Sequence, residues 1–193
     1  MKKVMMILFA VMMMVTMYGC GSTPDASEEN PGSEESQYKD SLEVLNQVFD
    51  SYEEGERFAV YGGNQENAVM DAPGMFDISK AEELEMVLGL PQDQSTNIED
   101  AASMVHMMNG NTFTGAAYRL KDNVDVNAFA DSVKACIQDK QWICGQPDTL
   151  IILQADDRYV ITAYGEAGII EIFKNNVLSS LNGAKVVTEA PIA

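Results

Sequence analysis

The start of the chain determines how much of it is left to fold. Two lysines near the N-terminus precede an unbroken apolar run, Val4–Val15, which ends shortly before Gly19 and Cys20. A short positive segment, an apolar core of about 7–15 residues and a small residue before the cleavage site are typical of a secretory signal peptide. The run is also shorter than the roughly 20 residues that a membrane-spanning helix needs. We therefore predict a signal peptide over residues 1–19.

The end of this segment predicts a lipid attachment site. Met17-Tyr18-Gly19-Cys20 resembles the lipobox of bacterial lipoproteins, in which a small residue precedes the cysteine that receives the lipid. The alternatives are an uncleaved N-terminal anchor and cleavage by ordinary signal peptidase. Lipidation is favoured because Cys20 lies where the apolar run has ended and a polar segment begins. We expect palmitate or a similar acyl chain on Cys20 to hold an extracytoplasmic protein on the cell membrane.

The segment that follows predicts a disordered acidic tether over residues 20–37. It is rich in Ser, Glu, Pro and Gly, and Ala26 is its one ordinary aliphatic residue. Such a segment cannot bury enough apolar surface to offset the entropy cost of folding. We expect one globular domain to follow, over residues 38–193.

Hydrophobic periodicity in this last region predicts both helices and strands. Apolar residues at helical spacing predict helices that begin near Asp40, Ser79, Asn127 and Gly165. The pairs Asp40 with Glu43 and Ser79 with Glu82 have the spacing of capping boxes. Runs of β-branched and aromatic residues predict strands over Thr112–Leu120, Leu150–Leu153 and Tyr159–Tyr164, with an edge strand over Lys185–Val187.

Two stretches leave more than one interpretation open. Asn97–Met108 fits a helix as well as a strand, and residues 65–75 fit a loop with a strand near Ala68–Met70. From Thr112 onward the predicted order is β-α-β-β-α. This order predicts a single α+β domain with an antiparallel or mixed sheet and helices packed mainly on one face.

The charge of the chain limits its partners. Its formal net charge is −18, with 30 acidic and 12 basic residues. Nucleic acid is a poor partner because its phosphates need neutralisation by Lys and Arg. The acidic residues are scattered, which favours a solubilising surface over a cation-binding face. The partners that remain are the membrane, through the lipid on Cys20, and an unknown envelope protein or small ligand.

Residue types exclude most catalytic sets. His106 is the only histidine, so a zinc site with two histidines cannot form within one chain. A Cys/His hydrolase would pair His106 with Cys136 or Cys144. The paired acids Asp156 and Asp157 fall in a predicted turn, where Asp is common for structural reasons. No cofactor is indicated, and a non-enzymatic role is favoured over a catalytic one.

The two cysteines left after Cys20 allow two interpretations. An oxidising exterior would let Cys136 and Cys144 form a disulfide. The alternative is two separate buried thiols, which is the favoured interpretation.

A local cluster of soft ligands suggests a metal site. If the segment around Met104, His106 and Met108 is a strand, the three side chains share one face. Thioether and imidazole groups suit Cu(I) outside the cell. The favoured alternative is ordinary core packing by flexible Met side chains.

Several segments also carry a family resemblance. They are Ser79–Leu88, Met107-Met108-Asn109, Trp142 with Pro147, Asp157–Ile161, and Ile170 with Phe173. These positions, within Ile78–Leu181, resemble a family of bacterial lipoproteins called domain of unknown function 4358. The resemblance implies an envelope lipoprotein and implies no particular activity.

The sequence thus predicts a membrane-anchored extracytoplasmic lipoprotein of unknown activity that acts as a non-enzymatic binding or interaction module. The alternatives are a small cell-envelope hydrolase and a copper-handling lipoprotein that uses the Met/His cluster.

Replacing Cys20 with Ala is expected to abolish metabolic labelling of the protein with radioactive palmitate, because the thiol that would carry the lipid is removed. The measurement is autoradiography of the immunoprecipitated protein beside the wild type. Labelling that persists in the variant would refute the predicted attachment site.

Overall fold

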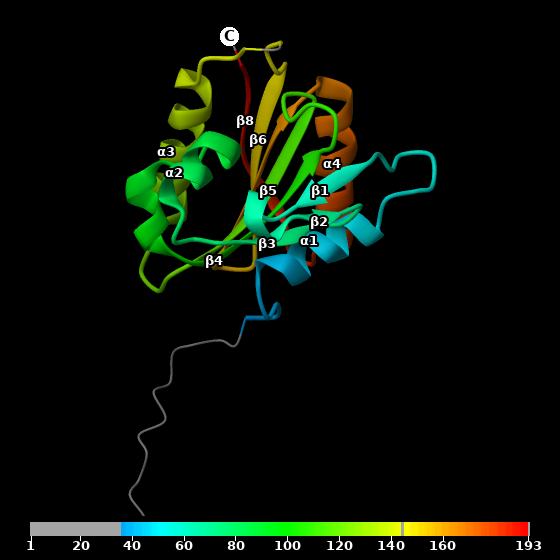
Figure 1. The fold of residues 1–193 in the computed structure, drawn as a ribbon. Coiled ribbons are helices and arrows are strands. Elements are labelled where there is room, and N and C mark those ends of the chain that lie inside the picture. The colour runs from blue at the N-terminus through cyan, green and yellow to red at the C-terminus, as the bar shows by residue number, and fades with distance from the viewer. Residues whose placement is uncertain (1–35, 144, 193) are drawn as a thin grey trace, which may run out of the picture. The chain divides into compact units, whose positions relative to one another are not determined.

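The computed structural model describes residues 36–143 and 145–192 (Figure 1). The predicted signal peptide, the predicted lipidation site Cys20, the predicted tether as far as residue 35, and Cys144 lie outside the described residues.

An antiparallel sheet of eight strands forms the centre of the domain. Its order is β2-β1-β4-β5-β7-β6-β8, and β3 also pairs with β4. The strands are β1 Val60–Gly62, β2 Val69–Met70, β3 Gly74–Phe76, β4 Ile98–His106, β5 Phe113–Leu120, β6 Thr149–Ala155, β7 Tyr159–Gly165 and β8 Lys185–Pro191.

Helices connect these strands. They are α1 Ser41–Asp50, η1 Gln65–Asn67, α2 Ala81–Glu83, η2 Leu84–Leu88, η3 Gln92–Asn97, α3 Val126–Asp139 and α4 Ala167–Ser180. The η2 segment is a π-helix that continues α2 without a break. From β5 onward the order β-α-β-β-α confirms the prediction, as does the α+β class with an antiparallel sheet.

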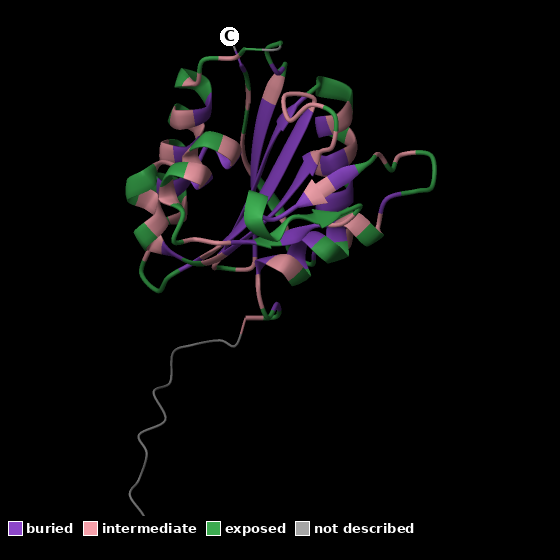
Figure 2. Cartoon of the chain, in the orientation of Figure 1, coloured by how far each residue is buried: buried purple, intermediate pink, exposed green. Residues whose placement is uncertain are grey.

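The helices lie on both faces of the sheet, so the prediction that they pack mainly on one face is wrong. Helices α1 and α4 cover one face, while α2, η2 and α3 cover the other (Figure 1). The reason lies in the central strands, which are buried along almost their whole length instead of at every second position: all seven residues of β7, including the polar Thr162, are buried. A strand that is apolar on both faces must be covered on both. Figure 2 shows this burial along the central strands.

Small residues in β5 make room for aromatic side chains on the α1–α4 face. A Cβ atom on Gly115 would lie 2.8 Å from the Phe113 ring. The Phe113 ring packs edge-to-face on Phe173 of α4, with 5.3 Å between centroids. Gly115 therefore leaves room for the Phe113 ring of the same strand to lie over it and meet Phe173 of α4.

Pairing with neighbouring strands decides the two ambiguous stretches. Strand β4 forms because it pairs with β5 along one edge and with β1 and β3 along the other. The predicted loop contains β3 as well as β2, because Gly62 and Gly74 let two backbones approach closely. A Cβ atom on Gly62 would lie 2.0 Å from the Gly74 nitrogen. Close backbone approach of this kind is not visible in a hydrophobic pattern.

The two predicted capping boxes have different outcomes. At α1 the Asp40 carboxylate accepts a hydrogen bond from the Glu43 amide at 2.9 Å, which confirms Asp40 as the cap. At α2 no side chain caps the helix. The Ser79 amide donates instead to the Asp77 carboxylate at 3.0 Å, so that capping box is wrong.

Replacing Phe173 with Ala is expected to lower the free energy of unfolding by about 3–5 kcal/mol, because the buried ring leaves a cavity against Phe113. Leu178→Ala, on the same helix at a side chain that is 40% exposed, is the control and should cost much less. Urea unfolding monitored by circular dichroism measures both. Equal losses would show that the α4 face is not packed as described.

Candidate functional site

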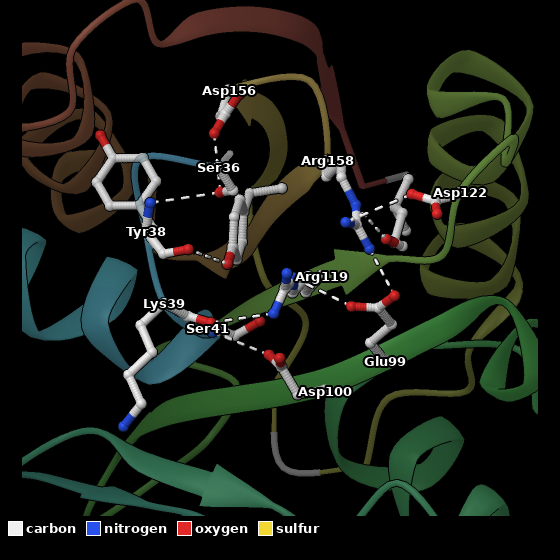
Figure 3. A network of polar contacts seen from close by, with 12 residues as sticks. Ser36, Tyr38, Lys39, Ser41, Glu99, Asp100, Arg119, Asp122, Asp156 and Arg158 are labelled. Carbon is white, nitrogen blue, oxygen red and sulfur yellow. Dashed lines mark hydrogen bonds and ion pairs between the residues drawn. The ribbon is translucent and has the colours of Figure 1, made fainter. Parts of the chain in front are cut away.

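The first described residues, 36–41, form a strap that is bound to one end of the sheet (Figure 3). The Ser36 hydroxyl donates to the Asp156 carboxylate at 2.9 Å, and the Gln37 amide donates to the same group at 3.1 Å. The Tyr38 side chain is 5% exposed and packs edge-to-face on Tyr159. The strap is thus held both by polar contacts and by burial of an aromatic ring.

Two further contacts bind the strap at its other end. The Arg119 guanidinium donates to the Lys39 carbonyl at 3.0 Å, and the Ser41 amide donates to the Asp100 carboxylate at 2.9 Å. These partners lie on β5 and β4, distant in sequence from the strap. The point where the chain enters the domain is therefore fixed to the central strands.

Arg119 is itself held by an ion-pair network. Arg119 and Arg158 both pair with Glu99, and Arg158 also pairs with Asp122 at 3.4 Å (Figure 3). Each arginine side chain is about one-quarter exposed. Both arginine charges are paired with carboxylates of this network, so the two arginines stabilise the structure at this end of the domain.

The Asp156 carboxyl group, which binds the strap, has a lowered pKa. Burial opposes its ionisation, but hydrogen bonds from the Asp157 amide, the Ser36 hydroxyl and the Gln37 amide outweigh burial and hold its pKa below the ordinary value of 3.8. Donors that favour the charged form lower a pKa in this way. The ionised carboxylate is therefore the form that fastens the strap.

A groove of about 920 Å³ lies on the opposite face of the sheet from α1 and α4, between α2–η2 and α3. Glu82, Glu85 and Met86 line it from α2–η2. From α3 and the residue after it come Ala135, Cys136, Asp139 and Lys140. This volume lies in the range of about 300–1,000 Å³ that is usual for ligand sites.

Lys140 and Tyr164 hold one wall of the groove in place. The Lys140 ammonium donates to the Met86 carbonyl at 2.7 Å, and the Tyr164 hydroxyl donates to the Val87 carbonyl at 2.7 Å. Carbonyls near a helix C-terminus lack partners within the helix, and these two contacts satisfy them. The wall formed by η2 is thereby fastened to α3 and to β7.

The Lys140 side chain lies in an aromatic setting. Its nitrogen is 5.0 Å from the centroid of the Trp142 ring and 5.4 Å from that of Tyr164. Burial lowers the pKa of Lys140, and burial raises the pKa of Tyr164 to about 12. Cation–π contacts of this geometry offset part of the cost of removing the ammonium from water.

The three predicted copper ligands differ in burial and in their place along the strand. Met104 is 1% exposed and belongs to the core on the α1–α4 face, whereas Met108 lies beyond the end of β4 and is 85% exposed. The His106 ring stacks on Phe58, and its Nδ1 accepts the Met108 amide at 3.2 Å. No group of three or more His, Cys, Asp or Glu side chains among the described residues could hold a metal ion. Copper binding stays a prediction.

Of the residues predicted for a Cys/His hydrolase, the structure describes His106 and Cys136, and these lie on opposite faces of the sheet. His106 stacks over the α1–α4 face, while Cys136 lies on α3, which covers the other face. Burial, followed by the nearby Glu85, raises the pKa of the Cys136 thiol, which opposes formation of a nucleophilic thiolate. Cys144 lies outside the described residues, so the disulfide and a pairing of Cys144 with His106 stay predictions.

Sequence reasoning missed the groove because its walls come from segments far apart in the chain. The one local signal is Met86, a large apolar residue that is 68% exposed on a helix whose neighbours Leu84 and Leu88 are buried. An apolar side chain off the buried face of a helix can mark a binding surface.

No family model matches the sequence, and comparison with the curated proteins and with the solved structures found no match. No helix among residues 36–143 and 145–192 is long and apolar enough to cross a membrane.

Replacing Asp156 with Asn is expected to speed hydrogen exchange at the Gln37 amide and to cost about 1 kcal/mol of stability, because a charge-assisted hydrogen bond weakens. The native pKa of Asp156 is depressed, so its contribution is present above pH 3.8 and is lost as the pH falls through the native value. The difference between wild type and variant should therefore shrink in acid.

The matched control is Asp157→Asn, which removes one charge from the neighbouring exposed residue. Exchange measured by mass spectrometry should change little in that control. An equal change in both variants would mean that the Asp156 carboxylate does not fasten the strap.

Proposed function

We propose that this protein is an extracytoplasmic lipoprotein, anchored to the cell membrane through Cys20, whose folded domain is a non-enzymatic binding module. The groove between α2–η2 and α3 is its binding site. The resemblance of residues 78–181 to a lipoprotein family agrees with this proposal.

The groove is the observation that carries the proposal. It combines a suitable volume with polar groups and an exposed apolar side chain, Met86. Concave sites that mix these features are the usual places for ligands. The wall that carries Met86 is fastened by Lys140 and Tyr164, so the site is largely formed before a ligand arrives. A preformed site reduces the ordering cost of binding.

The strap supports the tethered part of the proposal. A domain held by a flexible tether receives any pull at the point where the chain enters it. In this domain that point is bound by Asp156, Asp100 and Arg119 and by the buried Tyr38 ring. With about 5–6 Å × √n for such chains, a tether over residues 21–35, ahead of the bound Ser36 and Gln37, would reach on the order of 21 Å. The domain would therefore work close to the membrane.

A photo-crosslinking amino acid at Ala135, which lines the groove, tests the binding role in living cells. We expect one discrete crosslinked product from this position, and its loss when Cys20 is also replaced with Ala, because an untethered domain would leave the membrane. The control position is Glu53, an exposed residue that does not line the groove. The same products from both positions, or none from Ala135, would overturn the groove as the binding site.

A further inference from the structure

The carboxylates of the groove lack basic partners. Glu82 and Asp139 form no ion pair among the described residues, and Glu85 accepts a hydrogen bond from the neutral Gln92 amide at 2.6 Å. The acidic groups lie on both walls, because Glu82 and Glu85 come from α2–η2 and Asp139 comes from α3. The groove is therefore acidic on both sides.

The one lysine of the groove does not neutralise it. The Lys140 nitrogen is directed at the Met86 carbonyl and at the Trp142 and Tyr164 rings. It forms no ion pair with the carboxylates among the described residues. Its ammonium group thus fastens the wall of the groove, and the carboxylates of the groove keep their negative charge unpaired by any described basic residue.

The same carboxylates also act on a neighbouring side chain, the Cys136 thiol. After burial, the carboxylates of Glu85, Asp139 and Asp93 raise the pKa of the Cys136 thiol, against the opposing effect of Lys140. A thiolate is disfavoured there for the same reason that a ligand cation is favoured.

The apolar part of the lining shows that charge alone does not describe the ligand. Met86 is 68% exposed and lies with Pro91 and Ala135 in the groove. Met side chains adapt to partners of varied shape and are common on binding surfaces. A ligand that fits both features carries cationic groups and apolar side chains together.

The length of the groove favours a peptide. It runs along α3 from Ser132 to Lys140, which is about 12 Å at 1.5 Å per residue. An extended peptide of about four residues covers the same distance at about 3.3 Å per residue. Alternate side chains of such a peptide point in opposite directions, so basic groups and apolar groups can reach different parts of the groove.

We infer that the groove binds a basic segment of another envelope protein, in which Lys or Arg alternates with apolar residues. This inference rests on the proposed binding role of the groove and adds the chemistry of its partner.

The test is binding of a labelled peptide, acetyl-Lys-Leu-Lys-Leu-Lys-Leu-amide, to the purified full chain, measured by fluorescence anisotropy. The triple variant Glu82→Gln, Glu85→Gln, Asp139→Asn should weaken binding about tenfold or more. Met86→Ser should also weaken it, and binding should fall as salt rises. Circular dichroism verifies that each variant is folded.

The matched control removes three charges elsewhere, with Glu53→Gln, Glu54→Gln and Asp131→Asn, all exposed and outside the groove. Its affinity should stay within about twofold of the wild type. An equal loss in both triple variants would show attraction to net charge alone and would overturn the inference. Equal binding of the peptide with Glu in place of Lys, or competition by spermidine at the same concentration as the unlabelled peptide, would also overturn it.

The two proposals can fail separately. If the peptide does not bind but Ala135 still yields its discrete crosslink in cells, the inferred ligand chemistry is wrong and the groove remains the binding site. If both measurements fail, the proposed function fails as well.

Discussion

The fold depends on burial of both faces of one antiparallel sheet. Strands β5, β6 and β7 are buried at nearly every position and carry mostly apolar side chains, so each uncovered face would present a surface that water disfavours. Helices α1 and α4 cover one face, and α2, η2 and α3 cover the other. The groove between η2 and α3 is a consequence, because two helical segments that pack side by side on a sheet leave a furrow between their outer surfaces.

The edges of the same sheet are poorly suited to bind another strand. Strand β2 has only two residues. Strand β8 carries Lys185 and Pro191, and its pairing with β6 shifts register between Ile152 and Leu153. Short edge strands, charges, prolines and bulges are the features that oppose edge-to-edge pairing. A partner is therefore expected to bind at a helical surface, such as the groove between α2–η2 and α3, and not along a sheet edge.

Local patterns predicted the elements, and tertiary contacts decided what the patterns left open. The strands from Thr112 onward and the cap at Asp40 follow from composition and spacing. Strand β3 depends on the close approach of Gly62 and Gly74, which only the folded chain reveals. Helices on both faces could have been expected from the run Tyr159–Tyr164, in which Thr162 is the one residue outside the hydrophobic types, because a half-exposed strand would alternate.

The candidate site was less accessible to sequence reasoning than the fold. The predicted ligands Met104 and Met108 differ in exposure, since β4 ends at His106 and leaves Met108 outside the strand. No sequence pattern marks Lys140 as part of the site. Its role is to donate a hydrogen bond to the Met86 carbonyl, which belongs to another helical segment. Polar groups whose partners are distant in sequence cannot be assigned from spacing alone.

A second concave surface of the domain could also bind a peptide, so a direct test must show which of the two surfaces the peptide occupies. It is an apolar groove of about 470 Å³ near β2 and β3, with Val69 and Met75 in its lining. Nuclear magnetic resonance of the isotopically labelled protein during titration with the basic peptide would distinguish the two surfaces. If the groove binds the peptide, amide shifts should concentrate in η2 and the C-terminal half of α3. Shifts concentrated at β2 and β3, with η2 unchanged, would contradict binding in the groove.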